Sequence, residues 1–229
     1  MNLVVLTGAG VSAESGLATF RDLGGLWAQV RLEEVATPEA FAADPGRVQG
    51  FYDARRAQLR RVAPNPAHHA LARLEREWRR GEVLLVTQNV DDLHERAGSR
   101  RLLHMHGELR RARCLACGAD SPWEEDIAPA SRCPACGLPG RLRPHVVWFG
   151  EVPLHMEEIS SAVAACDVFV SVGTSGQVWP AAGFVRMLPA GARSIEVNPM
   201  ATEVSPAFRE HRRGPASVEV PRLVAELLA

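Results

Sequence analysis

Short apolar runs rich in β-branched residues recur along this chain of 229 residues. A strand that is apolar at nearly every position has to be covered on both faces, which is typical of a parallel sheet between layers of helices. Helical patterns such as Ala67–Arg79 separate several of the runs. We therefore expect an α/β fold with a doubly wound parallel sheet. The expected strands are Leu3–Leu6, Val83–Val86, Leu102–Met105, Val146–Phe149, Val168–Val172 and Ser194–Val197.

Two segments interrupt this alternation of strands and helices. Residues 20–60 contain no clear strand, and residues 107–145 are rich in Cys, Pro, Gly and Arg. We expect the second segment to be a small insertion stabilised by a metal ion. The larger domain would then be discontinuous, and a helical module and the insertion would form a smaller one. The expected boundaries are 1–34, 64–106 and 146–229 for the larger domain, and 35–63 and 107–145 for the smaller domain.

Charge and hydropathy exclude several kinds of partner. The formal net charge is −1, so no electrostatic attraction to nucleic acid or to an anionic membrane is expected. No run reaches the ~18 consecutive apolar residues of a membrane span, and the first residues read as a strand and a turn rather than as a signal peptide. We therefore expect a cytoplasmic protein with no nucleic-acid or membrane partner. The chain is also expected to be a monomer, although its sequence contains no signal for its oligomeric state. All 26 basic residues are arginine.

The turn after the first expected strand is rich in glycine. Its sequence "GAGVSA", from Gly8 to Ala13, matches the G-x-G-x-x-G/A pattern of dinucleotide-binding turns, although a purely structural turn is the alternative. In an enzyme that transfers hydride, an acidic residue about 20 residues further on would close a second strand and bind the ribose. Glu33 and Glu34 lie near that distance, but in a segment that reads as loop and helix. We expect dinucleotide binding without hydride transfer.

Four of the five cysteines form two Cys-x-x-Cys pairs. Cys114, Cys117, Cys133 and Cys136 have the spacing C-x2-C-x15-C-x2-C, which is within the range for a zinc site. Four thiolates leave no open coordination position, so the zinc ion is expected to be structural. Thiols without metal are the alternative. Cys166 precedes an apolar run and is expected to be buried in the core.

Small polar residues follow several expected strands, at the edge where parallel sheets bind ligands. "TQNVDDLH" places Gln88, Asn89 and Asp91 there, although Asn89 or Asp91 could equally cap a helix. "HMHG" adds His104 and His106, which alternation puts on one face and either of which could be a core histidine. "SVGTSG" and "VNP" repeat the pattern at Ser171–Gly176 and Val197–Pro199. Together these ends fit a nucleotide-binding crevice better than separate caps do.

These motifs resemble, in order and over nearly the whole chain, those of the sirtuins, the NAD-dependent protein lysine deacylases. "GAGVSAESGLATFR" resembles the family's GAGxSxxSGxxxFR signature, "TQNVD" its TQNxD, and "HMHG" its catalytic HG. The four cysteines resemble its zinc ribbon, and "VVWFGE", "VGTS" and "VNP" follow in the family's order. The resemblance implies a Rossmann-like domain beside a smaller domain with the ribbon, with NAD and an acyl-lysine protein substrate meeting between them.

The resemblance also assigns roles to residues. His106 would be the general base: as the acyl oxygen attacks C1′ of the nicotinamide ribose, nicotinamide leaves and His106 then accepts a ribose-hydroxyl proton. The products would be nicotinamide and O-acyl-ADP-ribose. Mono-ADP-ribosyl transfer from the same NAD, and a non-enzymatic NAD-binding module, are the alternatives. The implied NAD-binding residues are Gly8, Ala9, Gly10, Ser12, Ala13, Phe20, Arg21, Trp27, Gln88, Asn89, Asp91, Gly173, Thr174, Ser175, Asn198 and Ala216.

The choice of acyl group depends on a Tyr-x-x-Arg pair. Spacing of i, i+3 puts Tyr52 and Arg55 on one helix face, where a phenol and a guanidinium can bind a carboxylate. The alternative is a solvated basic face, to which Arg56, Arg60 and Arg61 would belong. The pair resembles that of sirtuins that remove succinyl and malonyl groups, so we expect a bacterial deacylase active on acetyl and succinyl or malonyl groups. The resemblance adds Ala36, Val146, Val147 and Phe149 to the substrate site.

Overall fold

The computed structural model describes residues 1–17 and 31–229, and its larger sheet has six strands that are all paired in parallel. Their order is β3-β2-β1-β7-β8-β9, so the chain builds outward from β1 on one side and then from β7 on the other. This reversal creates the switch point at which doubly wound sheets bind ligands, and the expected fold is confirmed. The strands are β1 (Leu3–Thr7), β2 (Val83–Thr87), β3 (Leu102–His104), β7 (Val168–Val172), β8 (Arg193–Val197) and β9 (Glu210–Arg212).

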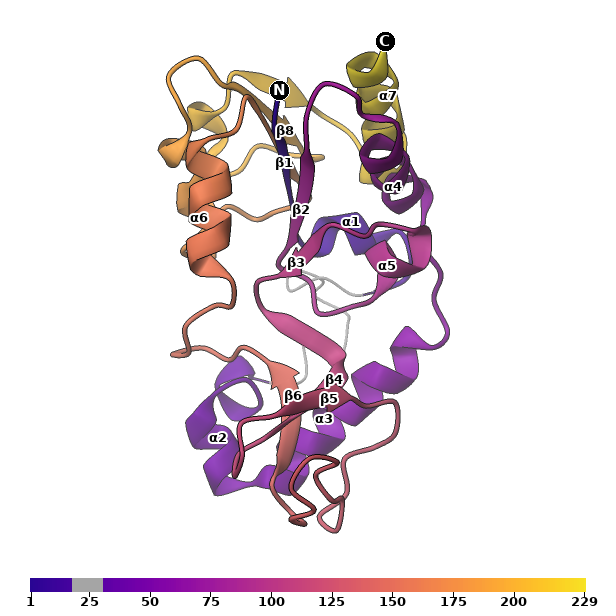
Figure 1. Ribbon diagram of the computed structural model, residues 1–229, viewed down its shortest axis with the longest axis vertical. Helices are drawn as coiled ribbons and strands as arrows, with labels where there is room; N and C mark the ends of the chain where they lie inside the picture. Colours follow the sequence, from indigo (N-terminus) through magenta and orange to yellow (C-terminus); the bar gives the residue numbers. More distant parts are fainter. Residues whose placement is uncertain (18–30) are drawn as a thin grey trace.

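Helices cover both faces of this sheet (Figure 1). On β1, Leu3 and Val5 pack in the apolar cluster under α4 (Pro66–Glu77) and α7 (Ala216–Leu228). Val4 and Leu6 pack in the cluster under α6 (Met156–Ala164) and the 3₁₀ helix η3 (Ala181–Met187). The near-continuous apolarity of the strands therefore has the expected cause. Shorter elements are α1 (Ala9–Ala13), α5 (Leu93–Ala97) and η4 (Ser205–Ala207).

A second group of elements lies beside the large sheet, at the bottom of Figure 1, and we call it the small module. It combines an antiparallel sheet of order β5-β4-β6 with two helices and one 3₁₀ helix. Its apolar cluster includes Val48, Phe51, Leu109 and Val146, which joins the helices to the sheet. The elements are η2 (Leu32–Glu34), α2 (Pro38–Ala43), α3 (Pro45–Leu59), β4 (Gly107–Cys114), β5 (Asp120–Pro122) and β6 (Leu142–Val146).

Polar residues followed by proline start the helices that carry or support the site. Asp44 accepts a hydrogen bond from the backbone N–H of Arg47 at the start of α3. Asn65 caps α4, and the ring of His68 returns a bond to the Asn65 backbone, which completes a capping box. Proline in the first turn has no N–H to leave unsatisfied, so it favours these starts.

One expected strand is wrong. Of Val146–Phe149, only Val146 lies in a strand, namely the end of β6. Val147 and Phe149 donate their backbone N–H groups to two separate partners, the carbonyls of His106 and Ala36, and not to a neighbouring strand. Of this run, Val146 and Trp148 pack in the apolar cluster of the small module. Within the described residues no helix is long and apolar enough to cross a membrane.

Candidate functional site

The glycine turn contacts a second turn across the switch point. The N–H of Gly10 donates to the carbonyl of Gly173 (2.9 Å), and that of Gly8 donates to Val172 (3.0 Å). A Cβ on Gly10 would lie 2.7 Å from the Gly173 Cα, and Gly173 itself has φ of +62°. The glycines are thus required where the turns after β1 and β7 meet. This contact explains the pattern structurally and brings the two halves of the expected NAD site together.

Polar side chains from the turn after β2 close over the glycine turn. Ser12 donates to Asp91 (3.0 Å), while Asn89 donates to Ser12 (3.1 Å) and to the carbonyl of Gly8 (3.2 Å). Burial raises the pKa of Asp91 to about 6, although bonds from Ser12 and from the Leu93 N–H oppose this shift. These contacts link four predicted NAD-binding residues, Gly8 included, in one buried network. Phe20, Arg21 and Trp27, predicted for the same site, lie outside the described residues.

Two histidines that contact this glycine turn and its strand, His68 and His94, were not predicted from the sequence. His68 lies 3.4 Å from the Ser12 hydroxyl, and His94 lies 3.0 Å from that of Thr7, which also donates to Thr87. Burial lowers the pKa of His68 to about 4 and that of His94 well below its usual value, so both rings are neutral at pH 7. They support the turn rather than face a ligand. The Asn-Pro pair at the start of α4 could have predicted the helix cap in which His68 takes part.

His106 and His104 have different environments. The Nδ1 of His106 lies 3.0 Å from the carbonyl of Gln88, and because a carbonyl only accepts, the proton sits on Nδ1 and Nε2 keeps its lone pair. Burial lowers the pKa of His106, against the effect of this bond. His104 is nearly inaccessible and binds the Glu95 carboxylate at 2.7 Å; burial opposes protonation, but Glu95 raises its pKa above the usual value. Of these two histidines, only His106 presents a ring nitrogen that can accept a proton.

The turns after β7 and β8 bring together the residues predicted for the adenosine side. The amide of Asn198 donates to the carbonyl of Thr174 (2.6 Å), whose hydroxyl bonds that of Ser171 (3.0 Å). Ser175 follows in the same turn and is half-buried. Ala216 begins α7 and packs in the apolar cluster against the sheet. Ala9 and Ala13 lie in α1, both half-buried.

Tyr52 and Arg55 lie in α3; Tyr52 is buried, and Arg55 is half-buried with its guanidinium carbon 5.7 Å from the centroid of the Phe51 ring. Tyr52 is 3 % exposed, and its hydroxyl accepts a hydrogen bond from Trp148 Nε1 (2.9 Å). Burial lowers the pKa of Arg55, while its interactions with Tyr52 and Asp91 oppose the shift. Arg55 is therefore within electrostatic reach of the turn after β2. That Tyr52 and Arg55 bind an acyl carboxylate stays a prediction at this point.

Arg56 does not belong to a solvated face. It is 1 % exposed, pairs with Asp53, and donates to the carbonyls of Leu109 (2.9 Å) and Glu125 (3.2 Å). The grouping of Arg56 with Arg60 as a solvated alternative is therefore wrong for Arg56, which fastens α3 to β4. Arg55 and Arg56 are neighbours in the sequence, and a run of arginines has no apolar pattern that would show which side chain is buried.

The remaining predicted substrate residues surround the link between β6 and α6. Val146 is buried in the small module, and Val147 contacts His106 through its backbone. The carbonyl of Ala36, itself buried, accepts the N–H of Phe149, whose side chain is 54 % exposed. This segment therefore connects the general-base candidate to the acyl-site candidates.

The four cysteines converge at the far end of β4. Their sulfurs all lie within 4.8 Å of one another, with 3.8 Å between Cys114 and Cys136 and 3.7 Å between Cys117 and Cys133. Four sulfurs about 2.3 Å from a tetrahedral zinc ion stand about 3.8 Å apart, so the donor set fits zinc. Gly107, next to His106, begins β4 and Cys114 ends it, eight residues that span roughly 24 Å. A zinc ion here is structural. Cys166 is buried away from this site, as expected.

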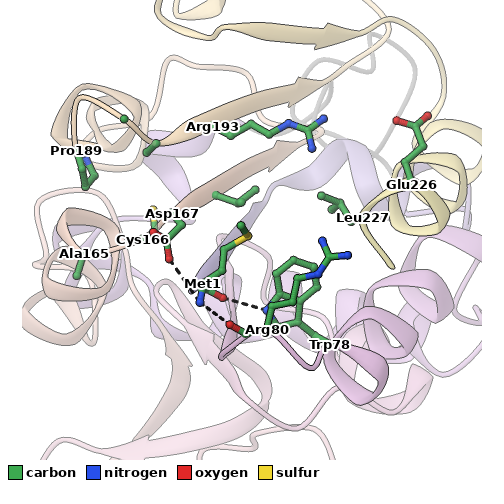
Figure 2. A pocket seen from close by; sticks show the side chains of 13 residues that line it. Met1, Trp78, Arg80, Ala165, Cys166, Asp167, Pro189, Arg193, Glu226 and Leu227 are labelled. Atoms are coloured by element: carbon green, nitrogen blue, oxygen red, sulfur yellow. Dashed lines mark hydrogen bonds and ion pairs between the residues drawn. The ribbon is translucent and has the colours of Figure 1, made fainter. Parts of the chain in front are cut away.

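A cavity of about 510 Å³ lies at the opposite edge of the large sheet (Figure 2). Met1, Val168 and Arg193 line it where β1, β7 and β8 begin, together with Trp78 and Arg80 after α4. It contains none of the predicted site residues. Open parallel sheets bind ligands at the carboxyl ends of their strands. The candidate functional site is therefore at those ends, where the polar turns after β1, β2, β7 and β8 lie, and not in this cavity. We call these turns the polar edge.

Known proteins resemble this chain in sequence and in structure. The model of the Sir2 family matches residues 8–180. An NAD-dependent protein deacylase of Bdellovibrio bacteriovorus is 59 % identical over 99 % of this chain and 97 % of its own length. A Sir2 homologue in complex with NAD superposes with a TM-score of 0.88 at 44 % identity, covering 100 % of this chain and 91 % of the other. Sir2Af2 bound to a myristoylated histone peptide superposes with a TM-score of 0.75 at 35 % identity, covering 99 % and 90 %. This chain therefore belongs to the Sir2 family, the sirtuins.

Proposed function

We propose that this chain is an NAD-dependent protein-lysine deacylase that releases nicotinamide and O-acyl-ADP-ribose. The observation that carries the proposal is the free Nε2 of His106 beside the network of Ser12, Asn89 and Asp91. Relatives that cover the full chain are named for this activity, and related structures hold NAD or an acylated peptide. The substrates of this chain would be acylated proteins.

The polar edge fits NAD. The close approach of Gly10 to Gly173 leaves backbone rather than side chains at the switch point, and the amide and hydroxyl groups of Asn89, Ser12 and Thr174 can bond ribose hydroxyls. Bound NAD supplies an activated C1′ with nicotinamide as leaving group. In this proposal His106 removes a proton from a ribose hydroxyl at its Nε2, and the Gln88 carbonyl holds the ring in the required tautomer. The four cysteines hold one structural zinc ion.

We further propose that Tyr52 and Arg55 bind the distal carboxylate of succinyl- or malonyl-lysine. Tyr52 is buried and Arg55 is half-buried, so solvent weakens a charge-assisted hydrogen bond to them less than it would at the surface. Ala36, whose small side chain is buried nearby in the same apolar cluster, leaves room for a longer acyl group. Acetyl-lysine has no carboxylate for Arg55 to bind.

A steady-state comparison of acetyl- and succinyl-lysine peptides, with Arg55→Met as the variant, tests this proposal. A hydrogen bond to a charged group is worth ~1.5–3 kcal/mol, so desuccinylation should lose roughly 10- to 150-fold in kcat/KM. Deacetylation should change by less than about threefold. Arg61→Met, which removes an exposed arginine after the same helix, is the matched control and should change neither activity.

The outcomes separate the parts of the proposal. Nicotinamide release that depends on the acyl peptide supports the deacylase, and protein-linked ADP-ribose in place of O-acyl-ADP-ribose would contradict it. An equal fall of both activities in Arg55→Met would assign Arg55 to folding or NAD binding. No fall in either would remove it from the acyl site.

We also propose that the two sheets belong to two domains. The larger one is discontinuous, at residues 1–34, 64–106 and 146–229, and its first segment ends with η2, which pairs with α3 of the small module through Glu34 and Arg47. The protein would act as a monomer in the cytoplasm, where a reducing environment keeps the paired thiols available for zinc. Light scattering of the purified protein tests the oligomeric state.

A further inference from the structure

Trp148 is held from several sides inside the small module. Its side chain is buried, and the guanidinium carbon of Arg143 lies 3.3 Å from the centroid of its ring. Arg143 binds both oxygens of Glu151 (2.6 and 2.9 Å), and Glu151 accepts the backbone N–H of Trp148 (2.8 Å). Phe41 packs against the ring with centroids 5.2 Å apart. The position of the indole is therefore fixed by contacts that do not involve any ligand.

The one polar atom of this indole is directed at Tyr52. Trp148 Nε1 donates to the Tyr52 hydroxyl at 2.9 Å, so the phenol oxygen acts as an acceptor there. Because the indole N–H points at the Tyr52 oxygen, the hydrogen of that hydroxyl points away from the indole, and no described residue accepts it. Burial raises the pKa of Tyr52 to about 12, although the bond from Trp148 lowers it, so the hydroxyl keeps its hydrogen at physiological pH.

We propose that Trp148 is a positioning residue that sets the choice of acyl group. By occupying the acceptor side of the Tyr52 hydroxyl, it leaves that hydroxyl as a donor to the carboxylate of a dicarboxylic acyl-lysine. The ion pair of Arg143 and Glu151 fixes Trp148, and Trp148 in turn orients Tyr52. This inference rests on the proposed carboxylate site of Tyr52 and Arg55.

The size of the effect follows from the kind of bond. Without the indole N–H, the hydroxyl of Tyr52 can rotate and its buried oxygen loses a donor. A net hydrogen bond between neutral groups corresponds to roughly 2- to 10-fold in a rate or equilibrium constant. The expected effect of Trp148 is thus smaller than that of Arg55, and it acts only on substrates that carry a carboxylate.

Trp148→Phe keeps an aromatic ring and removes only the donor and the second ring. We expect kcat/KM for a succinyl-lysine peptide to fall about 3- to 10-fold, mainly through KM. The value for the acetyl-lysine peptide should change less than about twofold. Trp78→Phe is the matched control, because Trp78 is equally buried and donates its N–H to the Met1 carbonyl (3.1 Å) at the opposite edge of the sheet (Figure 2). It should leave the ratio of the two activities unchanged.

A double variant distinguishes positioning from general packing. If Trp148 acts through the Tyr52 hydroxyl, adding Trp148→Phe to Tyr52→Phe should cause no further loss of selectivity. Equal losses on both peptides in Trp148→Phe, or a full second loss in the double variant, would overturn the inference while leaving the role of Arg55 intact. If Arg55→Met and Trp148→Phe both leave the ratio unchanged, the carboxylate site itself is wrong, and this inference fails with it.

Discussion

The position of one proton decides what His106 can do. With Nδ1–H donated to the Gln88 carbonyl, the neutral ring presents the Nε2 lone pair, and burial favours this neutral form by lowering the pKa. The neighbouring His104 is in the opposite situation, because Glu95 stabilises its charged form. Two histidines separated by one residue thus differ in the property that base catalysis requires.

His106→Ala should lower kcat by at least ~10²-fold, since general acid–base groups contribute ~10²–10⁴-fold. In the wild-type protein the active form is neutral, so activity is complete above the pKa of His106 and is lost as the pH falls through it. Because that pKa is lowered from 6.5, the acidic limb of kcat/KM should lie below pH 6.5. Steady-state rates of both proteins, with zinc content as a check of folding, measure this. A variant that keeps more than about a tenth of kcat contradicts the assignment.

At this scale the sequence predicts residue types better than it predicts environments. Alternation puts His104 and His106 on one face, and only the family resemblance selects His106. The basic run of α3 conceals that Arg56 is buried while Arg60, on the same face but past the last residue of the helix, is exposed. The partner of Tyr52 lies 96 residues away and leaves no local signal.

Among the elements, β4 runs from the residue after His106 to the first of the four cysteines. Gly107 has φ of +80°, and a Cβ there would lie 2.1 Å from the His145 carbonyl, so glycine is required directly after His106. At the other end, the apolar cluster beside the cysteines is small. Because this cluster is small, it cannot hold the segment together alone, and a structural metal ion is needed there. Its members are Ala112, Cys114, Ile127, Cys133 and Leu142.

Cys114→Ser should therefore lose zinc and unfold at a lower temperature. Cys114 is buried and its sulfur lies 3.8 Å from that of Cys136, so the substitution removes one of four ligands. Metal analysis and thermal unfolding of protein purified without chelators measure both effects. Cys166→Ser, at a buried thiol outside the ribbon, is the control and should keep one zinc per chain. Wild-type protein without zinc would contradict the assignment.

The accuracy of the predicted elements follows the depth of their burial. The apolar runs of β1, β2 and β7 predict their strands closely, because each is buried over its whole length, and β8 is buried from Ser194 onward. The strands of the small sheet lack this apolar pattern. In β6, whose sequence is "LRPHV", Arg143 is buried because it bonds Glu151 and not because it is apolar. The run Val146–Phe149 misleads for the converse reason, since it is apolar without being a strand.

In the molecule as a whole, the site is assembled from parts that the sequence keeps apart. The turns after β1 and β2 contact each other through Ser12 and Asp91. The segment after β6 contacts His106 through Val147 and helix α3 through the bond from Trp148 to Tyr52. A doubly wound topology predicts that strand ends converge. It does not predict where an inserted module lies. The position of Tyr52 and Arg55 relative to the strand ends could therefore be learned only from the structure.

The composition of the whole chain leads to a last prediction. A protein that works among acylated lysines carries none itself: all 26 basic residues are arginine, whose guanidinium stays protonated and is not a nucleophile. The thiol of Cys166 is also protected, because burial raises its pKa to about 11. Incubation with an acyl-coenzyme A thioester should therefore add an acyl group only to the Met1 amine and leave activity unchanged. Intact-mass spectrometry measures the adducts, and Arg61→Lys, at an exposed position, should gain one more. Stable acylation elsewhere on the unaltered chain, or loss of activity on incubation, would show that the absence of lysine does not protect this deacylase from its own substrate chemistry.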